Sequence, residues 1–109
     1  MKKVYLATPY TGTPEQQKER FDQACLIAGE IIQQGHCVFS PIAHSHPIAE
    51  ICGIDGTHDF WKDQNESWLS WCDEVWVAEI PGRQKSKGVQ WEISWAHKHG
   101  KRVRFMGGI

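Results

Sequence analysis

The chain has 109 residues and a formal net charge of −1, with 12 lysines and arginines against 13 aspartates and glutamates. This length suits a single domain, residues 1–109, with one hydrophobic core. The nearly neutral charge argues against a surface for polymeric nucleic acid. No apolar run approaches the roughly 20 residues that cross a membrane, and the first residues do not resemble a signal peptide. We therefore expect a cytoplasmic protein without a membrane partner.

The first part of the chain predicts a strand, a helix and a second strand. Residues 4–7 are apolar and precede a turn at residues 8–12. Thr13, Pro14 and Gln16 supply a cap, a first-turn proline and a capping-box partner for the helix that follows. Gly35 ends this helix, and residues 37–39 form a strand that Pro41 stops. The apolar residues expected on the buried face of the helix are Phe21, Ala24, Cys25, Ala28, Ile31 and Ile32.

The four cysteines, at positions 25, 37, 52 and 72, show no C-x-x-C spacing. Cys25 and Cys37 fall on expected core positions of the helix and the strand. We expect them to be reduced and buried, as suits thiols in a cytoplasm.

Residues 43–59 form the least regular part of the sequence, and we expect a long loop there. A loop of this length in a compact domain is more often functional than idle. His44 and His46 combine with Cys52 or His58 in no common zinc spacing, so we expect no metal ion.

The second part of the chain predicts two more helices and two more strands. Thr57 or Asp59 caps a helix over residues 60–71, and residues 75–78 form a buried strand. A helix from Ser86 to Gly100 and a last strand over residues 101–106 follow. This order indicates an α/β three-layer sandwich, with a parallel flavodoxin- or Rossmann-like sheet of four to five strands. Ligands of such sheets bind beyond the carboxyl ends of the strands.

The helix that begins near Ser86 has the features of an anion site. It follows a buried strand and a polar loop with Gly82, and its first turn contains Gly88. Free backbone N–H groups and the helix dipole favour an anion there, and Gly88 permits close approach. Glu92 lies four residues after Gly88, on the same face and about 6 Å further along the helix. This offset is roughly that between the phosphate and the anomeric carbon of a nucleotide.

Four segments of the sequence resemble one known family. They are residues 4–7 (Val-Tyr-Leu-Ala), residues 39–41 with 45–47, residues 72–77 (Cys-Asp-Glu-Val-Trp-Val), and Ser86-x-Gly88-Val89-x-x-Glu92-Ile93. The chain resembles the nucleoside 2-deoxyribosyltransferase-like family, in particular the small branch that includes 2'-deoxynucleoside 5'-phosphate N-hydrolases. The last segment is the most specific of the four.

The resemblance implies a role for each matching residue. Glu92 matches the nucleophile that attacks C1' of the sugar, and Tyr5 matches the tyrosine that hydrogen-bonds it. Ser86 and Gly88 match the grip on the 5'-phosphate. We expect the helix dipole to hold Glu92 ionised. The resemblance also implies a homodimer or higher homo-oligomer, and this chemistry needs no cofactor.

Other residues at the expected ligand edge are candidates for substrate binding. Pro9 and Tyr10 follow the first strand, and the segment with His44 and His46 falls on the same edge. These histidines are expected to contact a base or a sugar hydroxyl, or only to cap a turn.

The sequence departs from the family pattern at position 65. The family usually has an aspartate eight residues before the position of Asp73, where this chain has Asn65. An amide cannot act as an acid toward the departing base. Asp63 lies about 200° around the helix from that position, so it substitutes only if the local structure shifts.

Three functions therefore stay open. The first is an enzyme that cleaves the N-glycosidic bond of a (deoxy)nucleoside 5'-monophosphate, with Asn65 or Asp63 contacting the sugar or base. The second is a non-catalytic module that binds a nucleotide or an ADP-ribose-like ligand. The third is a purely structural dimeric protein.

Overall fold

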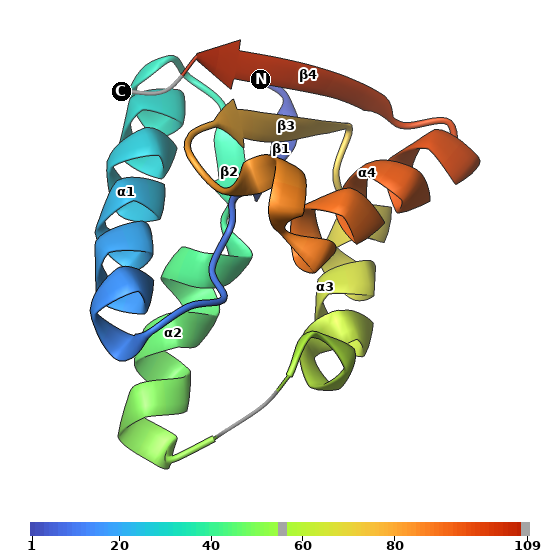
Figure 1. Cartoon of the computed structure of the whole chain (residues 1–109). Helices are drawn as coiled ribbons and strands as arrows, with labels where there is room; N and C mark the ends of the chain where they lie inside the picture. Colours follow the sequence, from blue (N-terminus) through green and yellow to red (C-terminus); the bar gives the residue numbers. More distant parts are fainter. Residues whose placement is uncertain (55–56, 108–109) are drawn as a thin grey trace.

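A four-stranded sheet, with every strand parallel to its neighbours, forms the centre of the molecule (Figure 1). It is seen in a computed structural model that describes residues 1–54 and 57–107. The strands are β1 (Lys3–Ala7), β2 (Cys37–Phe39), β3 (Glu74–Glu79) and β4 (Arg102–Gly107), in the order β2-β1-β3-β4. The helices are α1 (Pro14–Gln33), α2 (Pro41–Cys52), α3 (His58–Trp71) and α4 (Lys87–Lys98), with a short 3₁₀-helix η1 (Arg83–Lys85) before α4. The predicted three-layer α/β sandwich is confirmed.

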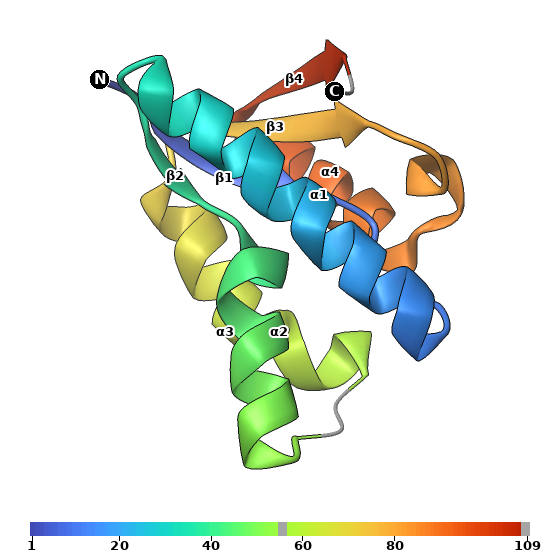
Figure 2. The ribbon, with the colours of Figure 1, turned by 90° about the vertical axis from the view of Figure 1, so that its left-hand side faces the viewer.

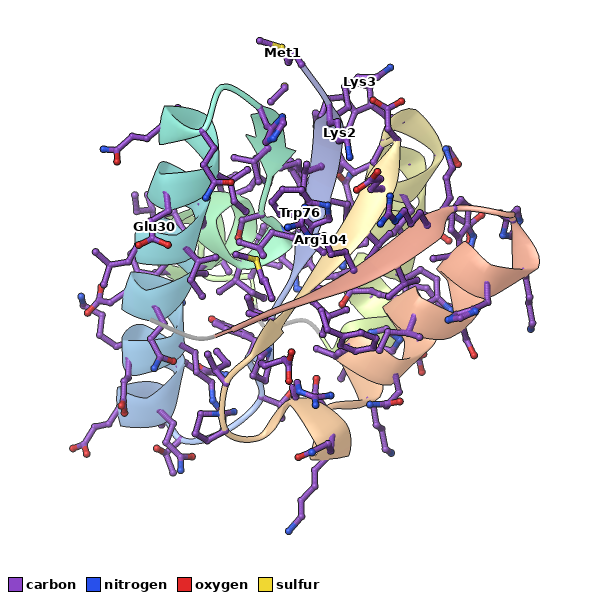
Figure 3. The ribbon with its side chains drawn as sticks, turned by 90° about the horizontal axis from the view of Figure 1, so that it is seen from above. Met1, Lys2, Lys3, Glu30, Trp76 and Arg104 are labelled. Atoms are coloured by element: carbon purple, nitrogen blue, oxygen red, sulfur yellow. The ribbon has the colours of Figure 1, made fainter. Side chains whose placement is uncertain are left out.

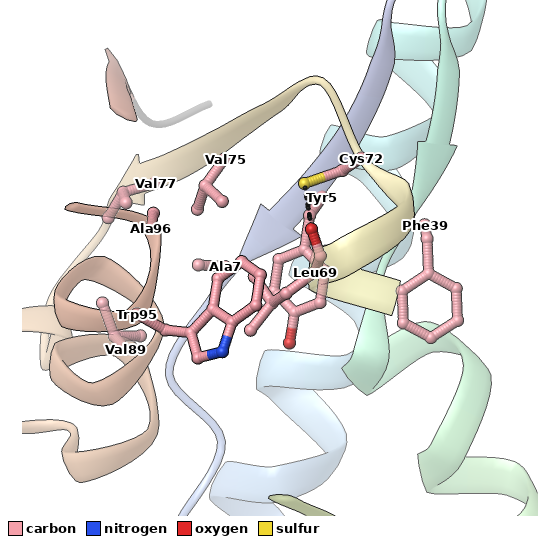
Figure 4. Packing of buried hydrophobic residues seen from close by; sticks show 10 residues of the cluster. All are labelled: Tyr5, Ala7, Phe39, Leu69, Cys72, Val75, Val77, Val89, Trp95 and Ala96. Atoms are coloured by element: carbon pink, nitrogen blue, oxygen red, sulfur yellow. Dashed lines mark hydrogen bonds between the residues drawn. The ribbon is translucent and has the colours of Figure 1, made fainter. Parts of the chain in front are cut away.

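The two central strands are buried on both faces of the sheet, because successive side chains of a strand point to opposite sides. On one face Val4 and Leu6 pack against α1, which lies across the sheet in Figure 2. On the other face Tyr5 and Ala7 pack with residues of α3 and α4, as Figure 4 shows. Continuous apolar runs are typical of such doubly covered parallel strands.

Helix α1 begins as predicted, with Thr13 and Gln16 forming the capping box. Its buried stripe differs from the prediction and consists of Ala24, Ile27, Ala28 and Ile31. Ile32 is 59% exposed, and Cys25 is also exposed. Cys25 follows the buried Ala24, and Ile32 follows the buried Ile31. Because successive side chains are about 100° apart around a helix, each of the two points away from the buried face.

The expectation that Cys25 and Cys37 are buried thiols is wrong. Cys37 is exposed at the first position of β2, which is an edge strand of the sheet. Cys72, at the end of α3, is buried instead and donates to the Leu69 carbonyl.

The prediction of a long loop over residues 43–59 is also wrong for most of its length, because residues 43–52 belong to helix α2. Ser40 caps this helix by accepting from the Ala43 N–H, and Pro41 stands in its first turn, where a missing N–H costs nothing. Pro47 lies inside the helix and Gly53 ends it in the left-handed conformation. Residues 55–56 lie outside the described residues. Helix α2 starts where β2 ends and packs beside α1 (Figure 2).

The remaining helices begin and end where sequence signals place them. Thr57, not Asp59, is the N-cap of α3, and its side chain accepts from the Phe60 N–H. Ser86 is the N-cap of α4. Gly100 follows α4 with φ of 69°, a conformation that favours glycine.

A cluster of polar side chains lies at the amino ends of the strands, away from their carboxyl ends. Glu74 accepts hydrogen bonds from Trp76 Nε1 (2.8 Å) and Lys2 Nζ (2.9 Å). These two bonds hold the pKa of Glu74 below its usual value. Arg104 lies over the Trp76 ring, 4.7 Å from its centroid, as Figure 3 shows. Within the described ranges, no helix is both long and apolar enough to cross a membrane.

Candidate functional site

A cleft of about 870 Å³ lies at the carboxyl ends of the strands. Its walls come from the segment after β1, the N-terminal part of α2, the first turns of α3, and the loop that leads into α4. The chain leaves β1 toward α1 and leaves β3 toward α4, and these two helices cover opposite faces of the sheet. A crevice opens where neighbouring strands send their connections to opposite faces, which is where ligands of such sheets bind.

One buried carboxyl group stands at the wall of this cleft. Glu92 is 5% exposed and belongs to the buried stripe of α4 with Val89, Trp95 and Ala96. The Tyr5 hydroxyl donates a hydrogen bond to Glu92 Oε2, as the sequence predicted. Tyr5 reaches it because odd-numbered side chains of β1 face α3 and α4. A carboxyl group rarely occupies an apolar stripe, so this position is unusual for a structural residue.

Burial governs the ionisation of this pair. It raises the pKa of Glu92 to about 8, and the hydrogen bond from Tyr5 offsets only part of that rise. Burial, together with the nearby Glu92 charge, raises the pKa of the Tyr5 phenol well above its usual value. Tyr5 therefore stays a donor. Burial therefore opposes the ionisation of Glu92 that the helix dipole was expected to favour.

The N-terminus of α4 lies on the wall of the cleft. Ser86 Oγ accepts from the Val89 N–H (3.2 Å), while the N–H groups of Lys87 and Gly88 precede the first intrahelical bonds. A Cβ added at Gly88 would meet nothing nearer than His58 Nδ1, at 3.7 Å. The fold itself therefore has room for a side chain here, and the space lies on the cleft wall.

Cationic side chains surround the same part of the cleft. Arg20, Lys85 and Lys87 line it. Arg20 also donates to the Thr11 carbonyl and approaches Gly82, so it ties the segment after β1 to the loop before α4. Gly82 has φ of 94°, which a side chain would strain. The positive charge and the helix N-terminus together suit an anionic group.

Comparisons with known proteins agree with this architecture. Residues 2–108 match a family model described as "Domain of unknown function (DUF1937)". The chain belongs to the DUF1937 family. No curated protein matches the sequence.

Among solved structures, this DUF1937 chain is similar to a 2-deoxyribosyltransferase from the psychrotolerant bacterium Bacillus psychrosaccharolyticus. The TM-score is 0.62 and the identity 18%, over 96% of this chain and 72% of the other. At this identity the likeness shows a common fold. The resemblance to nucleoside 2-deoxyribosyltransferase-like proteins is confirmed at that level.

The structure of the DUF1937 chain brings most of the predicted site residues together. Pro9, Tyr10, His46 and Asn65 line the cleft with Glu92, Ser86 and Gly88. Three predicted residues do not line it. Tyr5 is buried and contacts the site through its hydrogen bond to Glu92. Asp63 is exposed on α3 and His44 is exposed on α2, beside the rings of Phe39 and Trp68. The described residues hold no cluster of three or more possible metal ligands.

Several further residues line the cleft of the DUF1937 chain, although the sequence assigned them no role of their own. Thr8 ends the segment that carries Tyr5, and it is 5% exposed. Its Oγ1 is buried with no hydrogen-bond partner among the described residues, so a ligand hydroxyl or carbonyl is a natural partner. Its place directly after β1 was the available signal. His58 and Asp59, from the first turn of α3, also line the cleft. They belong to the segment over residues 43–59, which was expected at this edge.

Proposed function

We propose that this protein cleaves the N-glycosidic bond of a (deoxy)nucleoside 5'-monophosphate, as a hydrolase or as a transferase. One observation carries the proposal: the buried Glu92 carboxyl group, hydrogen-bonded by Tyr5, lies one helical turn beyond the open N-terminus of α4 in the same cleft. The fold shared with a 2-deoxyribosyltransferase supports this reaction class.

Glu92 is the proposed nucleophile. Its carboxyl group first loses its proton to solvent. The carboxylate then attacks C1' of the sugar, while the electron pair of the C1'–N bond leaves with the base. The Tyr5 phenol donates to one carboxyl oxygen, which fixes the direction of the other. The resulting glycosyl ester is then resolved by water or by a second base.

The N-terminus of α4 is the proposed phosphate site. The N–H groups of Lys87 and Gly88 can donate to phosphate oxygens, and the Ser86 hydroxyl retains its own proton for the same use. A phosphate held there places the sugar over Glu92, since a helical turn and the phosphate-to-C1' distance are similar. Pro9, Tyr10, His46 and Asn65 are the proposed contacts for the sugar and base.

Incubation with a panel of ribo- and deoxyribonucleoside 5'-monophosphates tests the proposal. Chromatography should detect free base, and Glu92→Gln should reduce its release by at least about 10³-fold, because an amide is no nucleophile. Nucleosides without a phosphate should react more slowly than the matched nucleotides. If the wild-type protein turns over no nucleotide, with water or with an added base as acceptor, the proposed reaction is wrong.

A second candidate function is binding without catalysis, and Asn65 favours it. This amide lines the cleft where the resembling family usually has an aspartate, and it has no acidic proton to give to a departing base. Such a protein would sense or sequester a nucleotide or an ADP-ribose-like ligand.

Calorimetry followed by recovery of the ligand separates the two functions. Tight binding of a nucleotide that is recovered unchanged after long incubation supports the binding function. Asn65→Asp would then be expected to introduce some cleavage, whereas an active wild-type enzyme would gain little from that change.

A further inference from the structure

The polar side chains of Tyr10, His46 and Glu50 lie in a row that leads from the cleft to solvent. The Tyr10 hydroxyl lies 2.6 Å from His46 Nδ1. His46 Nε2 lies 3.2 Å from Glu50 Oε2, four residues later on α2. Tyr10 and His46 line the cleft, while Glu50 is 69% exposed at the other end.

His46, the middle residue of this row, is buried and packed against an aromatic ring. His46 is only 6% exposed, and the Phe21 ring stacks on its imidazole with centroids 4.6 Å apart. Its Nε2 atom makes no hydrogen bond among the described residues despite its distance from Glu50. The Glu50 carboxylate is nevertheless the charged group nearest to Nε2 in this row, at 3.2 Å. A buried imidazole that contacts a hydroxyl group through one ring nitrogen is suited to proton transfer.

The proposed reaction needs such a group. A departing base requires a proton, Glu92 is engaged at C1', and Asn65 carries an amide in place of an acid. If the proposed function holds, we infer that Tyr10 protonates the departing base and that His46 replaces the proton on Tyr10. Tyr10 is then a catalytic residue, and His46 and Glu50 are positioning residues.

The transfer balances in one step. The C1'–N bond breaks with its electron pair on the base nitrogen, which takes the proton of the Tyr10 hydroxyl. The Tyr10 oxygen takes the Nδ1 proton of a His46 imidazolium, whose charge Glu50 stabilises. The products are a neutral base, a glycosyl ester on Glu92 and a neutral His46. Hydrolysis of the ester by water restores the Glu92 carboxylate and releases a proton. That proton returns through the Tyr10 hydroxyl to Nδ1 of His46, while Nε2 keeps its own proton toward Glu50.

The surroundings of Tyr10 fit this role. Burial and the nearby Glu50 charge raise the pKa of its phenol, so Tyr10 keeps its proton until a base nitrogen takes it. Asp59 is the other acid-bearing residue that lines the cleft besides Glu92, and it is the competing source of the proton.

A comparison of leaving groups tests the inference. The wild-type protein and Tyr10→Phe are assayed with a nucleotide that the wild type cleaves and with a nitrophenyl 2-deoxyriboside 5-phosphate. The nitrophenolate leaves without a proton. General acid catalysis contributes about 10²–10⁴-fold, so Tyr10→Phe should slow the nucleotide at least about 100-fold and the nitrophenyl substrate less than about 5-fold. His46→Phe, which keeps the ring stacked on Phe21, should show the same selectivity.

Three outcomes overturn the inference in different ways. An equal loss on both substrates shows that Tyr10 only binds or shapes the cleft. A selective loss in Asp59→Asn, with none in Tyr10→Phe, assigns the proton to Asp59. Failure of the wild type to release base from any nucleotide removes the proposed function itself. Thermal unfolding of each variant shows whether it is folded, and the phenyl ring of Tyr10→Phe keeps the aromatic packing.

Discussion

At the scale of single residues, Glu92 combines two properties that rarely occur together. It occupies a position in an apolar stripe, and it is ionisable. The sequence indicated its partner, because Tyr5 and Glu92 belong to segments that resemble one family. Burial of the carboxyl group could not be predicted from spacing, since it depends on how closely α4 packs against β1 and β3.

This burial makes the stability of the protein depend on pH. The ordinary pKa of a glutamate is about 4.5, and that of Glu92 in the folded protein is about 8. Between these values the folded chain holds a proton that the unfolded chain has lost, so the free energy of unfolding falls as pH rises. We expect Glu92→Gln to remove this slope, which is about 1 kcal/mol per pH unit in that window.

Urea unfolding of the wild type and of Glu92→Gln at pH 5, 6, 7 and 8 measures how the free energy of unfolding of each depends on pH. Glu30→Gln, which alters an exposed carboxyl group on α1, is the control. Parallel pH dependence in wild type and Glu92→Gln would show that the Glu92 carboxyl group is already ionised in the folded protein near pH 5.

At the scale of elements, the caps were predictable because they are local. Thr13, Thr57 and Ser86 each accept a hydrogen bond from the N–H three residues later, which is a pattern of a few neighbouring residues. Helix α2 was not predicted because the composition of its sequence is typical of a loop. Two prolines, Pro41 and Pro47, flank His44, Ser45 and His46. Contact with α1 and a proline in the first turn stabilise the helix instead.

Helix α4 contains a glycine whose presence the fold does not require. A Cβ at Gly88 would make only ordinary van der Waals contacts, and a Cβ at Gly29 in α1 would meet nothing within 4 Å. Alanine is favoured over glycine in a helix, by up to about 1 kcal/mol. We expect both Gly88→Ala and Gly29→Ala to raise the free energy of unfolding by a few tenths to about 1 kcal/mol.

Only one of the two variants should affect a ligand. Gly88→Ala places a methyl group on the cleft wall and should weaken binding of a nucleoside 5'-monophosphate by about tenfold or more, or about 1.4 kcal/mol. Calorimetric titration of both variants measures this effect, with Gly29→Ala as the matched control. Equal affinities would place the phosphate away from the N-terminus of α4.

At the scale of the whole molecule, the topology decides where the site lies. The strand order β2-β1-β3-β4 places β1 and β3 side by side, and their connections leave toward opposite faces. Tyr5 from β1 and Glu92 from the helix after β3 therefore meet at one edge, although 87 positions separate them. The order of elements predicted this edge correctly, because parallel crossovers have few allowed arrangements.

The homodimer or higher homo-oligomer implied by the resemblance stays a prediction at this scale. Large apolar side chains remain exposed on the described surface, among them Leu26 (61%), Phe60 (57%) and Phe105 (47%). Burial of such groups drives association. Light scattering during size-exclusion chromatography at micromolar concentrations should give at least twice the chain mass. A monomer mass at every concentration would contradict the prediction.

The parallel α/β architecture, most helix ends and the likeness between Ser86, Gly88, Glu92 and a nucleotide site can be predicted without a structure. These depend on local signals, namely apolar periodicity, capping residues and short motifs. Other features appear only in the folded chain. Asn65 lines the cleft while Asp63 is exposed, His46 is buried between Tyr10 and Glu50, and the Thr8 hydroxyl has no partner among the described residues. Each of these depends on the packing of one helix against another segment, which no stretch of sequence fixes on its own.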